Sequence, residues 1–399
     1  MVGSGAGQTC LRDPPYDDIL RAMSGFSAVI CGAGIAGVEG ALRLRRLAGD
    51  GVQVTLVDPG ESLVYRPLAV REPFALSGVR RYPLRAIAEA IGAHWRQDGV
   101  DGVDPAERTV HLAGGDDLAY DSLLLALGGR EASPHEHAHV FNDRNAGETF
   151  HGIVQDIEAG YITSLVLIEP DGPTWPLPLY ELALMTAERA YSMNASCEIT
   201  FITARERPLD AFGDGAAEAV ERLFADAGIT LHTGAAPRVA AARHVVVDDD
   251  IELHPQRVVT LPRITGPQLP GISGVEPYGL LPIDELCRVR DLDGRVFAAG
   301  DLTDYAVKHG GISAQQADTA AAAIAHLAGA GEAPRAFKPV VRGMLLTGRT
   351  PLFISAHLAE GRGWHSEVHA EPPWQADEKV VAEELGPFLR EQDQAAPRP

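Results

Sequence analysis

Three glycines, Gly32, Gly34 and Gly37, form the pattern G-x-G-x-x-G, which is the clearest sign of chemistry in the sequence. Positions without side chains allow a tight turn and let a pyrophosphate approach the N–H groups at the start of a helix. Asp58 follows about 20 positions later, where a carboxylate accepts hydrogen bonds from ribose hydroxyls. Together these residues predict a dinucleotide site; the alternative is a glycine turn that only packs a helix on a sheet.

The segments around these residues have the periodicities of a βαβ unit. The folded chain is expected to begin near Phe26 with a short β-rich run, to continue in a helix, and to reach a second strand that ends at Asp58. Residues 93–120 then alternate apolar and polar side chains around turns, as a β-meander does. After the meander, the chain is expected to return to the parallel sheet at residues 123–126.

A further candidate site lies late in the chain. A strand at 296–299 precedes Gly300 and Asp301, and a loop with Lys308 leads to Gly310 and Gly311. An alanine-rich helix is expected from about Ile312. Its N-terminus carries the positive end of the helix dipole, which favours a negatively charged group nearby.

Three segments together resemble the flavoproteins with two dinucleotide-binding domains. They are the first glycine motif, YDSLLLALGG at 120–129 and AAGDLTDYAVKHGGISAQQADTAAAAIA at 298–325. This superfamily contains the pyridine nucleotide-disulfide oxidoreductases, the type II NADH dehydrogenases and the sulfide:quinone oxidoreductases. The resemblance covers roughly residues 26–330. It implies an α/β fold of two Rossmann-like three-layer dinucleotide-binding domains with a β-meander insertion, plus a small C-terminal α+β region.

The resemblance also implies non-covalent FAD as the cofactor. The first glycine motif and Asp58 would hold its ADP half, and Asp301 would contact the ribityl or pyrophosphate part. The helix after Gly311 would point its positive end at the flavin and stabilise the reduced anion. The implied cofactor-binding residues are Gly32, Gly34, Gly37, Asp58, Gly300, Asp301, Gly311 and Ile312.

Four regions follow from this resemblance and from the composition. The last region is expected to supply strands and a short amphipathic helix with Val380, Val381, Leu385 and Leu389 on neighbouring positions, for packing or a homodimer interface. The regions are an N-terminal extension (1–25), a discontinuous FAD-binding domain (26–150 and 271–330), a degenerate second nucleotide-binding domain (151–270) and a C-terminal interface region (331–399).

The second domain departs from the pattern of the resembling proteins, in which another glycine motif binds NADH or NADPH. Here VLIEPDGPTWPLPLYE at 166–181 keeps the strand and the helix but only Gly172 of the glycines. Prolines from Pro170 to Pro178 remove N–H donors and fix φ, so the loop offers no amide nest to a pyrophosphate. A donor other than NAD(P)H is therefore expected, and Arg205 is not expected to meet a 2′-phosphate.

The four cysteines, Cys10, Cys31, Cys197 and Cys287, lie far apart and form no C-x-x-C pair. They indicate no disulfide framework, zinc cluster or local dithiol. Chemistry of the sulfide:quinone type needs cysteines beside the flavin, which this chain does not supply. Dithiol and persulfide mechanisms are therefore disfavoured.

Lys308 and Trp175 are the candidate catalytic residues. Lys308 precedes the late helix, as in the sulfide:quinone branch, where a cation would stabilise charge on the reduced flavin; the alternative is a solvated loop lysine. Trp175 and Tyr180 flank the proline loop and offer a surface that suits a planar, quinone-like substrate. Equally, these two aromatic residues would serve to pack the two domains together.

The composition excludes several other classes. The 399 residues carry a net charge of −21, which repels nucleic acid and anionic lipid surfaces. No apolar run reaches the ~18 residues of a membrane span, and the start resembles no secretion signal, so the cytoplasm is favoured. His135, His137 and His139 alternate but lack the fixed geometry of a metal site, so no metal is expected.

The sequence thus predicts an FAD-dependent oxidoreductase that passes electrons or hydride through a non-covalent flavin to or from a small planar, quinone-like substrate. Two alternatives stay open. One is an NAD(P)H-dependent flavin reductase or dehydrogenase with an altered second nucleotide site, which bleaching of the flavin by a nicotinamide would reveal. The other is a flavin-binding module without turnover.

Overall fold

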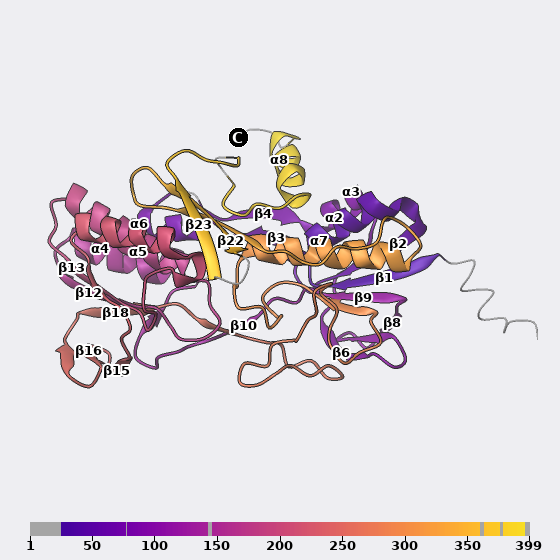
Figure 1. Ribbon diagram of the computed structural model, residues 1–399, viewed down its shortest axis with the longest axis horizontal. Coiled ribbons are helices and arrows are strands. Elements are labelled where there is room, and N and C mark those ends of the chain that lie inside the picture. Colours follow the sequence, from indigo (N-terminus) through magenta and orange to yellow (C-terminus); the bar gives the residue numbers. More distant parts are fainter. Residues whose placement is uncertain (1–24, 77, 143–145, 360–362, 376–377, 396–399) are drawn as a thin grey trace, which may run out of the picture.

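The computed structural model describes residues 25–76, 78–142, 146–359, 363–375 and 378–395, so the predicted N-terminal extension lies almost wholly outside the described residues. The molecule is elongated, with a parallel sheet and its helices at each end and the C-terminal region across the middle (Figure 1). The predicted α/β fold is confirmed.

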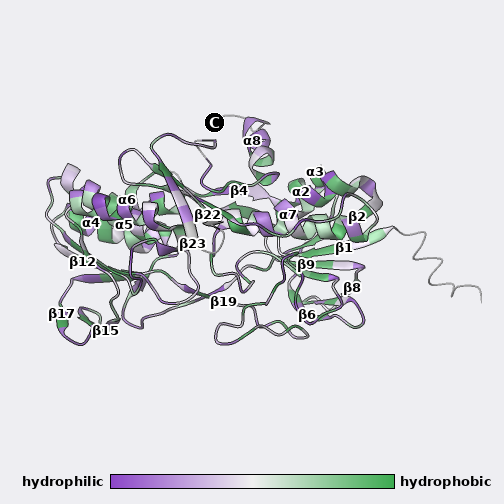
Figure 2. Cartoon of the chain, in the orientation of Figure 1, coloured by the Kyte–Doolittle hydropathy of each residue, from purple (hydrophilic) through white to green (hydrophobic). Residues whose placement is uncertain are grey.

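The first sheet has the strand order β20-β9-β1-β2-β5, with every pair parallel. Strands β1, β2 and β9 are largely hydrophobic (Figure 2), as expected of a sheet covered on both faces. Helix α2 packs closely on α7 and on β9 at Gly40, where a Cβ would lie 3.6 Å from the Cβ of Ala317 in α7 and 2.7 Å from Leu124 Cδ2 in β9. The elements are β1 (Phe26–Cys31), α2 (Ile35–Ala48), the 3₁₀ turn Gly49–Gly51, β2 (Val52–Val57), α3 (Leu84–Ile91), β5 (His94–Arg96), β9 (Ser122–Leu125), β20 (Val296–Ala298) and α7 (Gly310–Leu327).

The second sheet has the order β11-β18-β12-β13-β14 and is also parallel. Helices α4, α5 and α6 lie along it at the other end of the molecule (Figure 1). Strand β11 belongs to this sheet, although it precedes the domain boundary expected at residue 150. The elements are β11 (His139–Val140), the π-helical turn Ala146–Phe150, α4 (His151–Glu158), β12 (Ser164–Ile168), α5 (Leu177–Ser192), β13 (Glu198–Ile202), the 3₁₀ turn Asp210–Phe212, α6 (Asp214–Asp226), β14 (Thr230–His232) and β18 (Arg257–Thr260).

Each domain also contains smaller sheets of two or three strands. The expected meander is present as β6-β7-β8. Its predicted start was wrong, because His94–Arg96 pairs in parallel with β2 and extends the first sheet. Two strands, β10 and β19, pair between the domains. The elements are β3 (Ser62–Tyr65), the 3₁₀ turn Ala69–Phe74, β4 (Arg80–Pro83), β6 (Val100–Asp104), β7 (Thr109–Leu112), β8 (Asp117–Ala119), β10 (Arg130–Ala132), β15 (Pro237–Ala241), β16 (His244–Val247), β17 (Ile251–Leu253) and β19 (Arg263–Thr265).

The C-terminal region supplies the antiparallel sheet β21 (Val340–Leu345), β22 (Leu352–Ala359) and β23 (Gly363–His369), as predicted, and then α8 (Leu385–Ala395). The predicted helix was wrong at its start, because Val380 and Val381 precede α8. The buried Glu39 of α2 accepts hydrogen bonds from the N–H groups of Glu384 (3.0 Å) and Leu385 (2.5 Å), and so caps α8.

Candidate functional site

The glycine loop after β1 is shaped by its own backbone. Gly32 has φ +101°, and a Cβ there would lie 2.2 Å from the carbonyl oxygen of Ala126. A Cβ on Gly37 would lie 1.8 Å from the Gly32 oxygen, so the helix can approach the turn only with glycine at this position. Gly34 differs, because, its chain neighbours apart, no atom of the described residues lies within 4 Å of its Cβ position. The loop therefore keeps open space above the N-terminus of α2.

The N-terminus of α2 is suited to an anion. Its N-cap is Gly34, which makes no side-chain cap, and its first turn contains no acidic residue. The first N–H groups of a helix have no partner within the helix, and they carry the positive end of its dipole. These features, with the open space at Gly34, fit a pyrophosphate.

Asp58 lies beside this loop at the end of β2. Its carboxylate accepts hydrogen bonds from the N–H groups of Ala33 (2.7 Å) and Gly60 (2.8 Å). Asp58 therefore joins the glycine loop to the second strand. Its contact with a ribose stays a prediction.

The late Gly-Asp turn meets the same loop. Gly300 has φ +96°, and its Cβ position lies 3.6 Å from the Cβ of Ala36, the second residue of α2. The Gly300 N–H donates to the buried side chain of Gln316 in α7 at 2.7 Å. Asp301 lies against Gly129, whose Cβ position is 3.5 Å from the Asp301 Cβ. The three predicted motif segments thus converge at one edge of the first sheet.

Helix α7 begins at the far side of this edge. Its N-cap, His309, makes no side-chain cap, and the first turn contains no acidic residue, so this N-terminus also suits an anion. A Cβ on Gly310 would lie 2.9 Å from both Ile35 Cδ1 and Val380 Cγ2, so chain packs closely around it. Ile312 is buried, so only its backbone N–H can serve a cofactor.

Lys308 is a buried residue and not a solvated loop lysine. Only 4% of it is exposed, and its Nζ donates to the carbonyl oxygen of Thr303 at 2.5 Å. Burial lowers the pKa of Lys308 to about 8, although Asp301 and Asp304 oppose the shift. The ammonium group therefore titrates near neutral pH beside the Gly-Asp turn.

Trp175 reaches the same place from the second domain. A β-bridge joins Thr174 to Val307, and the indole ring lies 4.3 Å from the ring of His309, measured between centroids. Trp175 also packs on Phe212 at 5.4 Å. The two candidate catalytic residues, Trp175 and Lys308, therefore lie near one another around the start of α7.

His309 is a site residue that the sequence reasoning missed. Its ring is buried, makes a hydrogen bond with the backbone of Lys379, and leaves Nδ1 without a hydrogen-bond partner among the described residues. Burial, together with the nearby Lys379, lowers the pKa of His309 to about 3, so the imidazole is neutral. Its position next to Lys308 and the two glycines was the only signal in the sequence.

The sequence matches the pyridine nucleotide-disulphide oxidoreductase family over residues 26–158 and 181–326. The chain belongs to this family. It is 24% identical over 298 residues to the sulfide-quinone reductase of Aquifex aeolicus (strain VF5), a match that covers 69% of this chain and 68% of that protein.

Solved structures share the fold. The sulfide:quinone oxidoreductase from the hyperthermophilic bacterium Aquifex aeolicus matches with a TM-score of 0.76 and 18% identity, over 87% of each chain. A NAD-dependent persulfide reductase from A. fulgidus matches with a TM-score of 0.60 and 19% identity, over 84% of this chain and 64% of that chain.

Members of the family are flavoproteins, so this chain is an oxidoreductase that binds FAD. The predicted superfamily, enzyme class and cofactor are confirmed. The alternative of a flavin-binding module without turnover is wrong, because the family consists of oxidoreductases. The two uncapped helix N-termini and the space at Gly34 fit FAD. The assignment of single residues to the cofactor stays a prediction.

The family match is interrupted at 159–180, which contains the proline loop. Glu169 directly follows β12 and is buried, and burial raises its pKa. Its carboxylate accepts a hydrogen bond from the Tyr180 hydroxyl at 2.6 Å and lies 3.9 Å from Nε of Arg205. Tyr180 is fully buried, so the structure contradicts its predicted contact with substrate and supports a packing role.

A pocket of about 530 Å³ opens beside the proline loop. Gly172 lies in its wall with φ +87°, and a Cβ there would be 2.5 Å from the hydroxyl of Tyr278. Its charged lining comprises Asp171, Arg205, Glu276 and Asp304. Three carboxylates against one guanidinium make the pocket unfavourable for a pyrophosphate.

The cysteines of the described residues are placed for packing. Cys31 and Cys287 are fully buried, and Cys197 is partly buried. Burial raises the pKa of Cys31 to about 12 and that of Cys197 to about 11, and it also raises the pKa of Cys287. These thiols are therefore poor nucleophiles. Cys10 lies outside the described residues.

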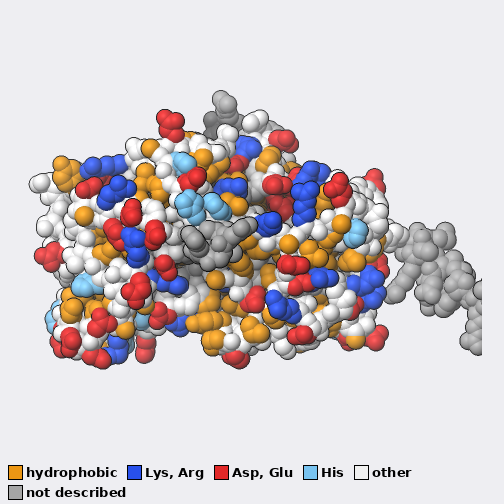
Figure 3. Space-filling view, viewed as in Figure 1, with side chains coloured by type: hydrophobic (Ala, Val, Ile, Leu, Met, Phe, Trp, Pro, Cys, Tyr) orange, Lys and Arg blue, Asp and Glu red, His pale blue; other side chains and the backbone are white. Residues whose placement is uncertain are grey.

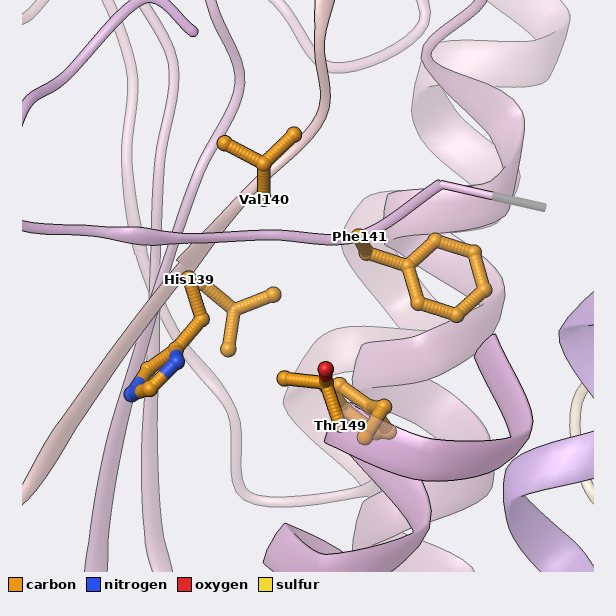
Figure 4. A pocket seen from close by; sticks show the side chains of 6 residues that line it. His139, Val140, Phe141 and Thr149 are labelled. Carbon is orange, nitrogen blue, oxygen red and sulfur yellow. The ribbon is translucent and has the colours of Figure 1, made fainter. Parts of the chain in front are cut away.

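A second hollow offers no space for a ligand (Figure 4). It is lined by His139, Val140, Phe141, Thr149, Phe150 and Val259. Phe141 and Phe150 pack edge to face at 5.8 Å and leave little room between them. Burial and nearby arginines lower the pKa of His135 and of His139, which favours the neutral imidazole. These rings lie on the crossover into the second domain, as expected.

Proposed function

We propose that this FAD-dependent oxidoreductase takes electrons from a donor other than NADH or NADPH and passes them to a small planar acceptor of the quinone type. The observation that carries the proposal is the proline-rich second loop, whose backbone and acidic surroundings do not suit a dinucleotide. A proline-rich turn cannot supply the amide nest that a dinucleotide needs. The hydroxyl of Tyr278 lies against Gly172, and three carboxylates line the pocket beside the loop.

The acceptor would bind where Trp175 approaches the start of α7. An indole ring offers a flat apolar surface, and it packs against the buried, neutral imidazole of His309. The relative named sulfide-quinone reductase has the same fold and supports an acceptor of this class. Sulfide itself is not favoured as the donor, because Cys31 and Cys287 are fully buried, Cys197 is partly buried, and burial raises the pKa of each thiol.

FAD, when bound, would supply the transfer of one or two electrons. Gly32, Gly34 and Gly37 would admit its pyrophosphate to the N-terminus of α2, with Asp58 holding the loop. The N–H groups of Gly311 and Ile312 would face the flavin, and Asp301, directly after Gly300, would contact the ribityl or pyrophosphate part. Lys308, when protonated, would place a positive charge on this side of the site. Trp175 would orient the acceptor and exclude water.

A second candidate is an NAD(P)H-dependent reductase. The pocket beside the proline loop favours it, because the pocket lies at the ends of β12 and β13, where a dinucleotide binds in such folds. The NAD-dependent persulfide reductase also shares this fold. The acidic lining of the pocket weighs against it.

A panel of donors and acceptors tests the proposal. The purified holoprotein is mixed anaerobically with candidate donors, and the flavin absorbance is followed; photoreduced protein is then mixed with benzoquinones and naphthoquinones. We expect saturable reoxidation by quinones. Reoxidation that stays slow and linear with quinone concentration would contradict the proposed acceptor class.

The proposal also covers location and partners: the protein lies in the cytoplasm, forms a homodimer and does not bind nucleic acid. Among the described residues, no helix has the length and apolar character needed to cross a membrane. Acidic and basic side chains are interspersed on the face shown in Figure 3, which offers no basic field to a polyanion. Cell fractionation and light scattering test the first two points.

A further inference from the structure

The hairpin of β16 and β17 places three side chains with metal-binding atoms on one face. Its register pairs Val246 with Glu252 and Val245 with Leu253, so the next step along the hairpin sets His244 opposite His254. Because side chains alternate between the faces of a strand, His244, Glu252 and His254 all lie on the face opposite the buried Val245.

The three ligand atoms already lie close together. Nε2 of His244 is 3.6 Å and Nε2 of His254 is 3.8 Å from Oε2 of Glu252, and one potential ligand atom of each residue lies within 4.8 Å of the others. Ligands of a tetrahedral zinc ion lie roughly 3.3–3.4 Å apart, because each bond is about 2.0–2.1 Å long. The two nitrogen–oxygen distances exceed this spacing by only a few tenths of an ångström, so side-chain rotations would bring the three atoms to a common ion.

The imidazole of His244 adds an independent observation. Its Nε2 is buried and makes no hydrogen bond within the described part of the chain. A buried polar atom without a partner is costly, and a metal bond would satisfy it. The His244 and His254 rings stack with centroids 4.9 Å apart, so both present nitrogen toward the same carboxylate.

We propose that His244, Glu252 and His254 form a surface site for a divalent transition metal ion of the zinc type. Two imidazoles and one carboxylate suit zinc, nickel or copper and not magnesium or calcium, which prefer oxygen ligands. The Glu252 and His254 side chains are 63% and 67% exposed, so the ion enters from solvent and water completes its coordination. The site lies in the second domain, apart from the proposed flavin site.

Zinc binding to the tag-free holoprotein tests the site. Equilibrium dialysis against Zn²⁺ at low micromolar free concentration is expected to yield one site equivalent that His244→Ala/His254→Ala removes. Glu252→Gln should weaken binding at least about tenfold, because it replaces an anionic ligand. Zn²⁺ should also raise the unfolding temperature of the native protein and leave that of the double variant unchanged. Mg²⁺ should do neither.

The other cross-strand histidine pair provides the matched control. His357 and His365 face each other on β22 and β23 with ring centroids 5.4 Å apart, and they belong to no three-residue group of possible ligands among the described residues. His357→Ala/His365→Ala should keep the equivalent. The proposal is overturned if the native protein binds no zinc in this range, or if the His244/His254 double variant, shown to be folded by its flavin spectrum, binds as much as the native protein.

Discussion

The two strand–loop–helix units of this molecule have the same topology, but their loops differ: the loop after β1 is rich in glycine and the loop after β12 is rich in proline. In both, a parallel strand ends in a loop that leads into a helix without an acidic first turn. The first loop has space at Gly34, whereas in the second the Cβ position of Gly172 is only 2.5 Å from a tyrosine hydroxyl. The comparison shows that a nucleotide fold does not by itself make a nucleotide site, because a few loop residues decide it.

Electrostatics separates the two loops further. The carboxylate of Asp58 is held by two backbone N–H groups at the rim of the first loop. The carboxylate of Glu169 lies buried at the base of the second, and burial raises its pKa. An incoming pyrophosphate would meet donors in the first loop and an acid in the second.

Gly34→Leu should have the largest effect on this contrast. The backbone of Gly34 has φ −76°, which leucine adopts freely, and the described part of the chain leaves its Cβ position open beyond the two neighbouring residues. The variant should fold, yet its side chain should fill the pyrophosphate space and raise the dissociation constant of FAD at least about 100-fold, or ~2.7 kcal/mol.

Fluorescence titration of the apoprotein with FAD measures this change. Gly51→Leu is the matched control, because Gly51 also has an open Cβ position but lies away from the loop. A Gly34→Leu protein that binds FAD like the control would refute the proposed cofactor position.

Asp58→Ala should have the next largest effect. It removes two charge-assisted hydrogen bonds within the loop, each worth about 1.5–3 kcal/mol, and any bond to the ribose. FAD should bind about 10- to 100-fold more weakly. Asp50→Ala, which removes a fully exposed carboxylate, should leave the affinity unchanged. An equal affinity in both variants would reduce Asp58 to a strand-end residue.

Lys308→Met should lower the rate of flavin reduction about tenfold, which corresponds to ~1.4 kcal/mol in activation free energy. The pKa of Lys308 is about 8, so its positive charge is present below that pH and lost above it. If the cation stabilises the reduced flavin, the native reduction rate should fall as pH rises through 8, and the variant should lack this step. Stopped-flow pH profiles measure it, with the exposed Lys338→Met as control. A variant that keeps the step would exclude Lys308 as its source.

Trp175→Ala should have the smallest effect on FAD and a selective effect on the acceptor. The ring packs on His309, so its loss should slow flavin reoxidation by quinones several-fold while FAD affinity changes little. Trp175→Phe should restore most of the rate, because it keeps an aromatic surface. Proportional loss of FAD affinity and acceptor rate would mean that Trp175 only packs the domains.

The sequence was a good guide where backbone chemistry decides the structure. The positive φ of Gly32, the approach of Gly37 to the Gly32 oxygen and the bond of Asp58 to Ala33 all arise within one βαβ unit. The positions of these residues could therefore be predicted. The contact of Tyr278 with Gly172 could not, because it joins residues far apart in the chain.

Long-range contacts also explain the errors at the C-terminus. Val380 and Val381 have helical spacing with Leu385, but Lys379 forms a buried ion pair with Glu181 at 2.5 Å and Val380 packs over Gly310. These contacts hold the segment outside the helix. Tertiary packing thus overrode a local pattern.

Anaerobic rapid mixing of the holoprotein with NADH and with NADPH tests the central claim most directly. If the proline loop, Glu169 and Tyr278 close the second nucleotide site, the flavin absorbance should fall slowly, with a rate that rises linearly up to millimolar nicotinamide. Saturable reduction by either nucleotide, at a rate that supports turnover with quinone, would contradict the account.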